Sequence, residues 1–350
     1  MSRGRYSLAI RLGAAAGSLL LFIVAAELLV SGAGINTYVG NRFFTLNRAL
    51  DYPEVFDKDH RLFWRLRPGR TVTSQYFEGR TYRINSQGLR GEEIDPRKKG
   101  RRILALGNSC TFGWGLPREE TFVGRLQDLL GDEYDVVNAG IPGYSSFQGR
   151  LLFESELAGL EPDIVVIMFG WNDQWAAASE IADKDQEFPP RIILECQNLL
   201  SRLDSYRLLK RLWLSTIERN PDSLFDRRAP VYRVGLEDFR DNLRSICRTS
   251  RARGIMPVLL TSPAPSLSVY PGAGRWSAPI GYHERYNRVT RELAASESII
   301  LVDAARRFER HDHLFDDAAQ NFIHFNASGH ELIARMLAEC IGGASGPGGP

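Results

Sequence analysis

The amino-acid sequence predicts an α/β fold: a three-layer α/β/α domain around a parallel five-stranded sheet, preceded by one N-terminal transmembrane helix. Three observations predict it. From residue 101 onward short apolar runs alternate with helical segments, polar residues collect directly after the apolar runs, and the chain opens with a long apolar segment. Strands separated by helices of ten or more residues need crossover connections, and these make a sheet parallel.

The first element is the apolar segment 12–34, in which Glu27 is the only charged residue. At 1.5 Å per residue it reaches roughly 35 Å, enough to cross the hydrocarbon core of a bilayer. Glu27 lies near the outer end of the segment, where the cost of burying a charge falls and its side chain can reach toward water. We therefore expect a signal anchor over residues 1–35.

The orientation of this anchor follows from its flanking charges. Arg3, Arg5 and Arg11 precede the apolar segment, and few basic residues follow it directly. The positive-inside rule then places the N-terminus in the cytoplasm and the body of the protein on the extracytoplasmic, periplasmic side. A cleaved signal peptide is the alternative, because Ala26 and Ala33 are suitable for a peptidase. The length of the apolar segment favours the uncleaved anchor.

Residues 36–100 are predicted to form a juxtamembrane connector with some strand character. Residues 71–73 and 81–84 have extended patterns, and residues 85–88 have a turn composition. The main domain is expected over residues 101–341. The Gly/Pro-rich tail 342–350 is expected to be disordered.

Five strands and five helices are predicted in the main domain. The strands are residues 103–106, 136–137, 164–169, 257–261 and 299–302. The helices are residues 118–130, 148–160, 236–253, 282–296 and 328–340. The glycine at 254 closes the third helix, and Ser328 with Glu331 has the pattern of a capping box at the start of the last.

Residues 174–235 exceed what a connection between a strand and a helix requires, since such connections usually have two to six residues. This insertion leaves the domain on the side where the sheet's crevice is expected. It is either a lid over the substrate or a surface excursion without a function at the site.

Composition excludes several classes of function. The 44 basic and 42 acidic residues leave a net charge of +2, so no basic face predicts a nucleic-acid partner. The four cysteines are far apart and form neither a CxxC pair nor a metal-ligand spacing, so we expect no metal and no cofactor. A disulfide framework is not expected in a chain of this length.

The residues that follow the predicted strands have the chemistry of a serine hydrolase. Ser109 follows the first strand, and His324 precedes the last helix, so they are a candidate nucleophile and general base. Gly140 and Asn172 lie after the second and third strands. In an open parallel sheet such positions border the ligand crevice. The Ser109 N–H, the Gly140 N–H and the Asn172 amide would then form an oxyanion hole.

The order of these residues along the chain resembles that of the SGNH, or GDSL-like, hydrolases. Residues 107–109 (GNS) resemble the family's GDS block, residues 138–140 (NAG) its glycine block, and residues 170–173 (GWND) its GxND block. His324 resembles the terminal DxxH block, and residues 82–91 (YRINSQGLRG) resemble a lead-in seen in membrane-anchored members. The resemblance implies a flavodoxin-like sheet and an ester-hydrolysing site.

Two positions depart from the family pattern. Asn108 replaces the GDS aspartate, which is not the nucleophile. Asn321 replaces the DxxH aspartate, so the base would lack a carboxylate to stabilise its imidazolium. Three interpretations follow: Asn321 orients His324 without supplying charge, Asp316 or Asp317 reaches His324 instead, or the domain is catalytically weak.

The sequence therefore predicts a membrane-anchored serine esterase that acts on acyl, and in particular acetyl, esters of an extracytoplasmic glycan or lipid through an acyl-Ser109 intermediate. An O-acyltransferase would use the same residues. A catalytically weak envelope glycan-binding module is the alternative of a different class. The pattern does not indicate a protein partner.

Overall fold

The computed structural model describes residues 3–36, 51–98, 100–177, 180–217, 231–266, 277–317 and 321–344. Its central sheet has five parallel strands: β5 (Arg101–Gly107), β6 (Tyr134–Gly140), β7 (Ile164–Met168), β8 (Met256–Leu260) and β9 (Ile300–Val302). They are arranged in the order β6-β5-β7-β8-β9. This is the strand order of flavodoxin-like sheets, so the predicted fold is confirmed.

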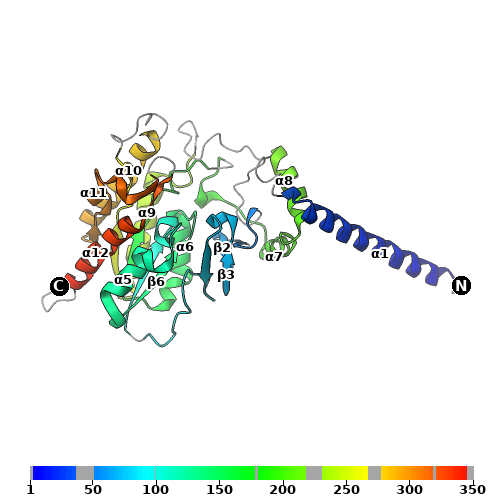
Figure 1. Ribbon diagram of the computed structural model, residues 1–350, viewed down its shortest axis with the longest axis horizontal. Helices are drawn as coiled ribbons and strands as arrows, with labels where there is room; N and C mark the ends of the chain where they lie inside the picture. Colours follow the sequence, from blue (N-terminus) through cyan, green and yellow to red (C-terminus); the bar gives the residue numbers. More distant parts are fainter. Residues whose placement is uncertain are drawn as a thin grey trace.

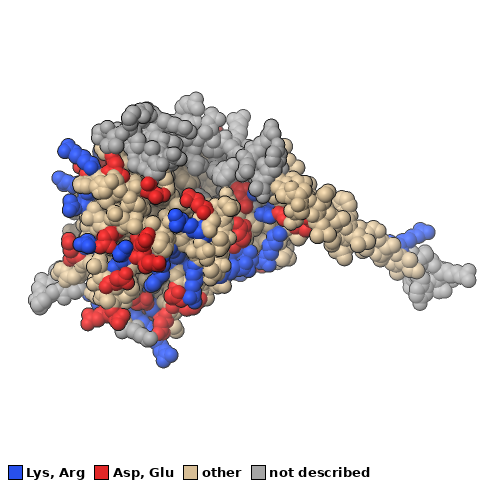
Figure 2. Space-filling model, in the orientation of Figure 1, with Lys and Arg blue, Asp and Glu red and all other residues tan. Residues whose placement is uncertain are grey.

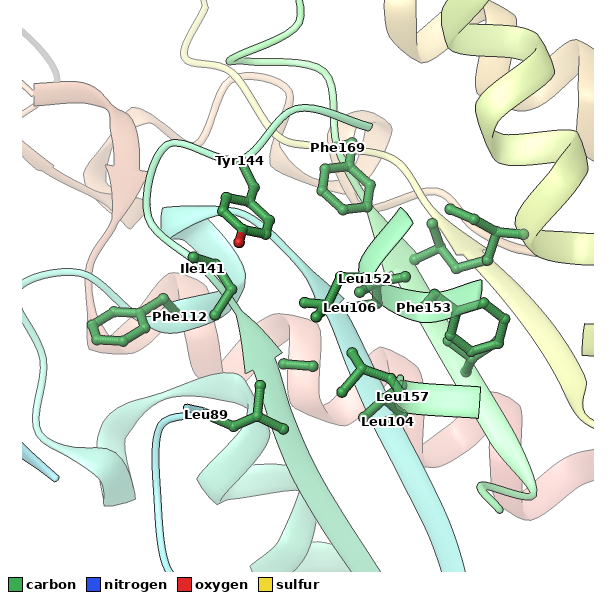
Figure 3. Packing of buried hydrophobic residues seen from close by; sticks show 14 of the residues in the cluster. Leu89, Leu104, Leu106, Phe112, Ile141, Tyr144, Leu152, Phe153, Leu157 and Phe169 are labelled. Carbon is green, nitrogen blue, oxygen red and sulfur yellow. The ribbon is translucent and has the colours of Figure 1, made fainter. Parts of the chain in front are cut away.

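Helices cover both faces of the sheet (Figure 1). Helices α5 (Phe122–Leu130), α11 (Ala304–Phe308) and α12 (Ala327–Ala344) lie on one face, and α6 (Ser146–Ser155), α9 (Leu236–Ala252) and α10 (Ser277–Ser296) on the other. Strand β5 serves both layers because its side chains alternate between the faces. Ile103 and Ala105 join the α5 and α12 core, whereas Leu104 and Leu106 join the α6 and α9 core. Figure 3 shows Leu104 and Leu106 among Leu152, Phe153 and Leu157.

Two predicted helices are each broken into two pieces. The predicted helix 118–130 is a 3₁₀ turn, η2 (Arg118–Glu120), followed by α5, because Thr121 is extended and caps α5 by accepting a bond from the Gly124 N–H. The predicted helix 148–160 is α6 followed by η4 (Leu157–Leu160). Helix α6 begins earlier than predicted because Ser145 and Gln148 form a capping box there.

The predicted capping box at the last helix is wrong. Asn326 caps α12 instead: its Oδ1 accepts bonds from the N–H groups of Ser328 at 3.0 Å and Gly329 at 3.1 Å. Ser328 therefore lies inside the first turn, and Glu331 pairs with Arg335 on the helix surface. Asparagine and serine are about equally good N-cap residues, so the pattern alone did not separate them.

Residues 51–98 pack onto the main domain. They form two antiparallel hairpins, β1 (Phe56–Asp59) with β2 (Phe63–Leu66) and β3 (Arg70–Thr73) with β4 (Thr81–Ile84), and a 3₁₀ turn, η1 (Gln75–Phe77). Strands β3 and β4 are the two predicted extended pieces. Buried side chains from this segment, Phe77 and Leu89 among them, belong to the same core as α6 and α9.

The N-terminal helix α1 (Arg3–Gly32) projects from the body of the molecule (Figure 1). Within it, Leu8–Gly32 is long and apolar enough to cross a membrane. In its most apolar 18-residue stretch, 6% of the residues are buried. The insertion contributes η5 (Asp183–Asp185), α7 (Arg191–Leu200) and α8 (Asp204–Ile217), of which α7 packs on β1 and α8 on α1. Residues 178–179 and 218–230 of the insertion and residues 345–350 of the tail lie outside the described residues.

The end of β6 approaches the short helix α4 (Ser109–Phe112) so closely that only glycine fits at Gly140. A Cβ there would meet the Phe112 backbone nitrogen at 2.2 Å. We expect Gly140→Ala to lower the free energy of unfolding by about 1–3 kcal/mol, as overpacking does. Urea denaturation measures the change. Gly159→Ala is the control, because a Cβ there meets nothing within 4 Å, and it should stay within about 0.5 kcal/mol of the wild type. Equal stability of the two variants would contradict the close approach.

Candidate active site

Ser109 lies at the carboxyl edge of the sheet, where β5 passes into α4. Asn108 is extended and caps α4 by accepting a bond from the Cys110 N–H at 2.9 Å. Ser109 is the first residue of the helix, so its N–H has no acceptor inside the helix. A Cβ at Gly107 would meet the Met168 carbonyl oxygen at 2.7 Å, which explains the glycine before the turn.

His324 comes from the other end of the domain, on β11 (Asn321–Phe325), which pairs with β10 (Phe315–Asp317). The Ser109 Oγ–H donates to His324 Nε2 at 2.8 Å. The His324 Nδ1–H donates to Asn321 Oδ1 at 2.7 Å. The structure thus brings together three predicted residues, Ser109, His324 and Asn321, in the order of a nucleophile, a base and an orienting group.

Burial lowers the pKa of His324 to about 4. The imidazole is therefore neutral at neutral pH, and its Asn321 partner fixes the tautomer whose Nε2 is free to accept a proton. Among the described side chains no carboxylate bonds to this ring, and the described partners, Ser109 and Asn321, are uncharged, so they do not offset the cost of charging it in a buried place.

The alternative partners of His324 were Asp316 and Asp317, and the structure places them on β10. Asp316 is exposed on β10. The backbone of Asp317 pairs with Asn321; its side chain lies outside the described part of the chain. The Nδ1 position of His324 is already occupied by Asn321, so the geometry favours Asn321 as the orienting residue.

Asn172 and Asp173 follow β7 and are both buried. Asn172 Nδ2 donates one bond to the Tyr144 carbonyl at 2.9 Å, which leaves its second N–H for a ligand. Asp173 accepts bonds from the N–H groups of Ser146 at 2.8 Å and Gly170 at 3.0 Å. Burial raises the pKa of Asp173 to about 6. Asp173 thus fixes the turn that presents Asn172.

Gly140, whose N–H was predicted to be an oxyanion donor, donates this N–H to Asn138 Oδ1 at 3.0 Å. The next glycine, Gly143, has a φ of +82° in the turn after β6. Its N–H has no acceptor within the described part of the chain, and its carbonyl accepts a bond from Arg233 at 2.7 Å. Sequence reasoning missed Gly143, although a second glycine three residues after the first was visible.

Arg90 is a second residue that sequence reasoning missed. Its buried guanidinium donates to the carbonyls of Phe112, Gly113 and Leu116, at 2.6, 2.8 and 2.6 Å. It therefore holds the carboxyl end of the helix that begins with Ser109. Burial lowers the pKa of Arg90 to about 10, so it remains charged at neutral pH. Its place in the segment 82–91 was the available signal.

Of Trp114, Trp171 and Trp175, Trp114 lies at the site. Its ring stacks on that of His324, with centroids 5.7 Å apart and planes at 14°. Trp171 is fully buried and donates to the Pro263 carbonyl, so it belongs to the core. Trp175 is half-buried, 5.9 Å from the Arg233 guanidinium.

Cys110, beside Ser109, is buried, and burial raises the pKa of its thiol well above the ordinary value. It is a small packed residue rather than a rival nucleophile. In the described part of the chain no group of three His, Cys, Asp or Glu side chains is placed to hold a metal ion.

A serine bonded to a neutral buried histidine at the carboxyl edge of a parallel sheet defines the class of serine hydrolases. The comparisons agree. Residues 105–332 match the model of the GDSL-like lipase/acylhydrolase family. The chain belongs to this family and is a carboxylic ester hydrolase.

Three similar proteins illustrate the relationship. An uncharacterized lipoprotein, YqeF, of Bacillus subtilis is 25% identical over 227 residues, which cover 59% of this chain and 71% of the lipoprotein. An acetylxylan esterase of Xylanibacter ruminicola is 32% identical over 97 residues, 24% of this chain and 20% of the esterase. The crystal structure of a lipase/acylhydrolase from Enterococcus faecalis has a TM-score of 0.46 and 20% identity, covering 71% of this chain and 100% of that chain.

Replacing Asn321 tests its place beside His324. Asn321→Ala should lower kcat at least about tenfold, because the imidazole loses the acceptor that orients it.

In the wild type, kcat/KM should fall as the pH falls through about 4, where His324 gains a proton. Asn321→Asp places a carboxylate against Nδ1, raises the pKa of His324 and moves this acid limb to higher pH. Rates measured from pH 3 to 9 decide. An acid limb that is unchanged in Asn321→Asp would contradict the contact.

Proposed function

We propose that the chain is a serine esterase that works through an acyl-Ser109 intermediate. The observation that carries the proposal is the continuous hydrogen-bonded arrangement from Ser109 through His324 to Asn321. His324 Nε2 takes the Ser109 proton while Oγ attacks the ester carbonyl. The imidazolium then gives that proton to the leaving alcohol. Water attacks the acyl-enzyme in the second step and restores Ser109.

The oxyanion of each tetrahedral intermediate needs donors that are free in the resting site. The Ser109 N–H at the start of α4 is one, and the second N–H of Asn172 is another. Gly143 supplies the third donor in this proposal, in place of Gly140. Arg233 fixes the Gly143 turn, because it also bonds Asp183 at 2.8 Å.

Trp114 compensates in part for the missing carboxylate. Its π face lies parallel to His324, so it meets the positive charge that forms when the imidazole takes the Ser109 proton. Asn321 orients the ring but contributes no charge. The proposed catalytic unit is therefore a Ser–His pair with a neutral orienting residue and an aromatic face.

The proposed substrates are acyl esters, and acetyl esters in particular, of a glycan or lipid outside the cytoplasm. Two findings support this. The chain resembles an acetylxylan esterase, and α1 has the length and composition of a membrane span, with Arg3, Arg5 and Arg11 on its N-terminal side. In this proposal residues 1–35 anchor the chain, residues 36–100 connect the anchor to the hydrolase domain, and the domain works on the periplasmic side.

Replacing the nucleophile is the direct test. With p-nitrophenyl acetate, the full-length protein should release p-nitrophenol, and Ser109→Ala should lower kcat by about 10³-fold or more, because the Ser109 hydroxyl is the one that bonds to His324 among the described residues. Thr111→Ala is the control for a nearby hydroxyl, and it should keep most of the activity. Equal turnover by the wild type and Ser109→Ala would overturn the mechanism. Release that requires an added sugar acceptor would instead identify an O-acyltransferase.

The role of Trp114 has its own test. Trp114→Leu should lower kcat roughly 5- to 30-fold, which corresponds to a lost cation–π contact of about 1–2 kcal/mol. Trp114→Phe keeps an aromatic face and should retain most of the rate. The KM of both variants for p-nitrophenyl acetate should change little, since the contact is to His324. A large rise in KM with unchanged kcat would show that Trp114 binds the substrate instead.

A further inference from the structure

The insertion helices α7 and α8 expose many of their large apolar side chains, although Leu194 and Leu214 are buried. On α8, Leu209 is 68% exposed and Trp213 is 54% exposed, and Leu212 between them is exposed as well. These positions are spaced i, i+3 and i+4, so they form one stripe along the helix. Arg211, on another side of the same helix, is buried and pairs with Asp51 at 3.1 Å.

Helix α7 also turns polar groups toward the protein. Asn198 accepts a bond from the Lys58 N–H of β1 at 2.7 Å and donates to the Lys58 carbonyl at 3.0 Å. Ile192 and Leu199 are 65% and 62% exposed, and Ile193 and Leu200 are exposed beside them. A helix that turns polar groups toward the protein and aliphatic groups outward is suited to an apolar surrounding.

Both helices lie where α1 meets the body of the molecule (Figure 1), close to the mostly uncharged surface of α1 in Figure 2. The Glu27 carboxylate of α1 accepts bonds from the N–H groups of Asp204 at 2.7 Å and Ser205 at 2.9 Å, the first residues of α8. An anion at a helix N-terminus is a favourable contact. Asn36 reinforces the junction, because its Nδ2 donates to the Asp204 carbonyl at 2.6 Å.

This junction fixes the depth of α8. The apolar span Leu8–Gly32 has 25 residues, and its rise of roughly 37 Å exceeds a hydrocarbon core of about 30 Å. Glu27 lies roughly 8 Å along the axis before Gly32, so it lies within a few ångströms of the outer edge of the hydrocarbon core if the span crosses the bilayer. Trp213 and Lys210, whose Nζ lies 4.3 Å from the indole centroid, are residues that membrane–water interfaces favour.

We propose that α7 and α8 form an interfacial platform that lies in the outer headgroup region of the membrane that α1 spans. The occupant of the exposed apolar face is phospholipid, because the face is continuous with the span and joined to it through Glu27. The insertion then sets the depth of the hydrolase domain against the bilayer. This inference rests on the proposed anchor, and its test separates the two.

The test uses full-length protein reconstituted in vesicles of phosphatidylcholine and phosphatidylglycerol. Cys196→Ser and Cys340→Ser remove the accessible thiols and leave Cys110 and Cys247, which are buried. Single cysteines for a nitroxide label are then introduced one at a time by Leu212→Cys on α8, Ile192→Cys on α7, Leu20→Cys in the span and Arg335→Cys on α12. The Arg335 side chain is 66% exposed, and it is the matched control in water.

Power saturation compares collisions of each label with oxygen, which enters lipid, and with a nickel chelate, which stays in water. The labels at positions 212 and 192 should collide several-fold more with oxygen than with the chelate, as the label at position 20 should, and position 335 should show the reverse. If positions 212 and 192 behave like 335 while 20 remains in lipid, the platform is wrong and the anchor stands. Exclusion of both reagents at 212 and 192 means a protein covers the face, which also overturns the proposal. If position 20 is also in water, the anchor itself fails.

Discussion

The hydrogen bond from the Ser109 hydroxyl to His324 Nε2 joins residues 215 positions apart. The surrounding structure positions these two residues within hydrogen-bond distance. Ser109 is fixed by β5 at the edge of the sheet, by the Asn108 cap and by Arg90 at the far end of α4. His324 is fixed by the β10–β11 pairing. A displacement of about 1 Å between two reacting groups is enough to lose most of the rate, so both supports are needed.

In the proposed mechanism, His324 works with a neutral partner, Asn321, where the family pattern has an aspartate. Burial lowers the pKa of His324 to about 4. The resting imidazole is therefore neutral, with an unprotonated Nε2, over a wide pH range, but its imidazolium is costly to form. The two effects act in opposite directions on the rate: the fraction of competent enzyme is high, and the intrinsic basicity of the ring is low.

The sequence was sufficient for the five-stranded parallel sheet and for the place of Ser109 at its carboxyl edge, because strand ends in a parallel sheet meet at one edge. The proposed group of Ser109, His324 and Asn321 is joined by hydrogen bonds in the structure. Spacing did not reveal that the N–H of Gly140, the expected oxyanion donor, donates to Asn138 Oδ1, two residues earlier. Such a local bond depends on side-chain rotamers that spacing does not report. The role of Arg90 did not follow from spacing either, since its carbonyl partners lie more than twenty residues further along the chain.

The insertion shows a different limit of sequence reasoning. Its amphipathic helices predict a buried apolar face, yet in α7 the bonded face is the polar one, through Asn198 and Gln197 to Lys58. Amphipathicity identifies two faces but not which of them meets protein. Arg233 returns from the end of the insertion to hold Asp183 and the Gly143 carbonyl. The insertion, whose helices α7 and α8 lie beside the anchor, is thus joined through the buried Arg233 guanidinium to the turn that contains Gly143, the proposed oxyanion donor.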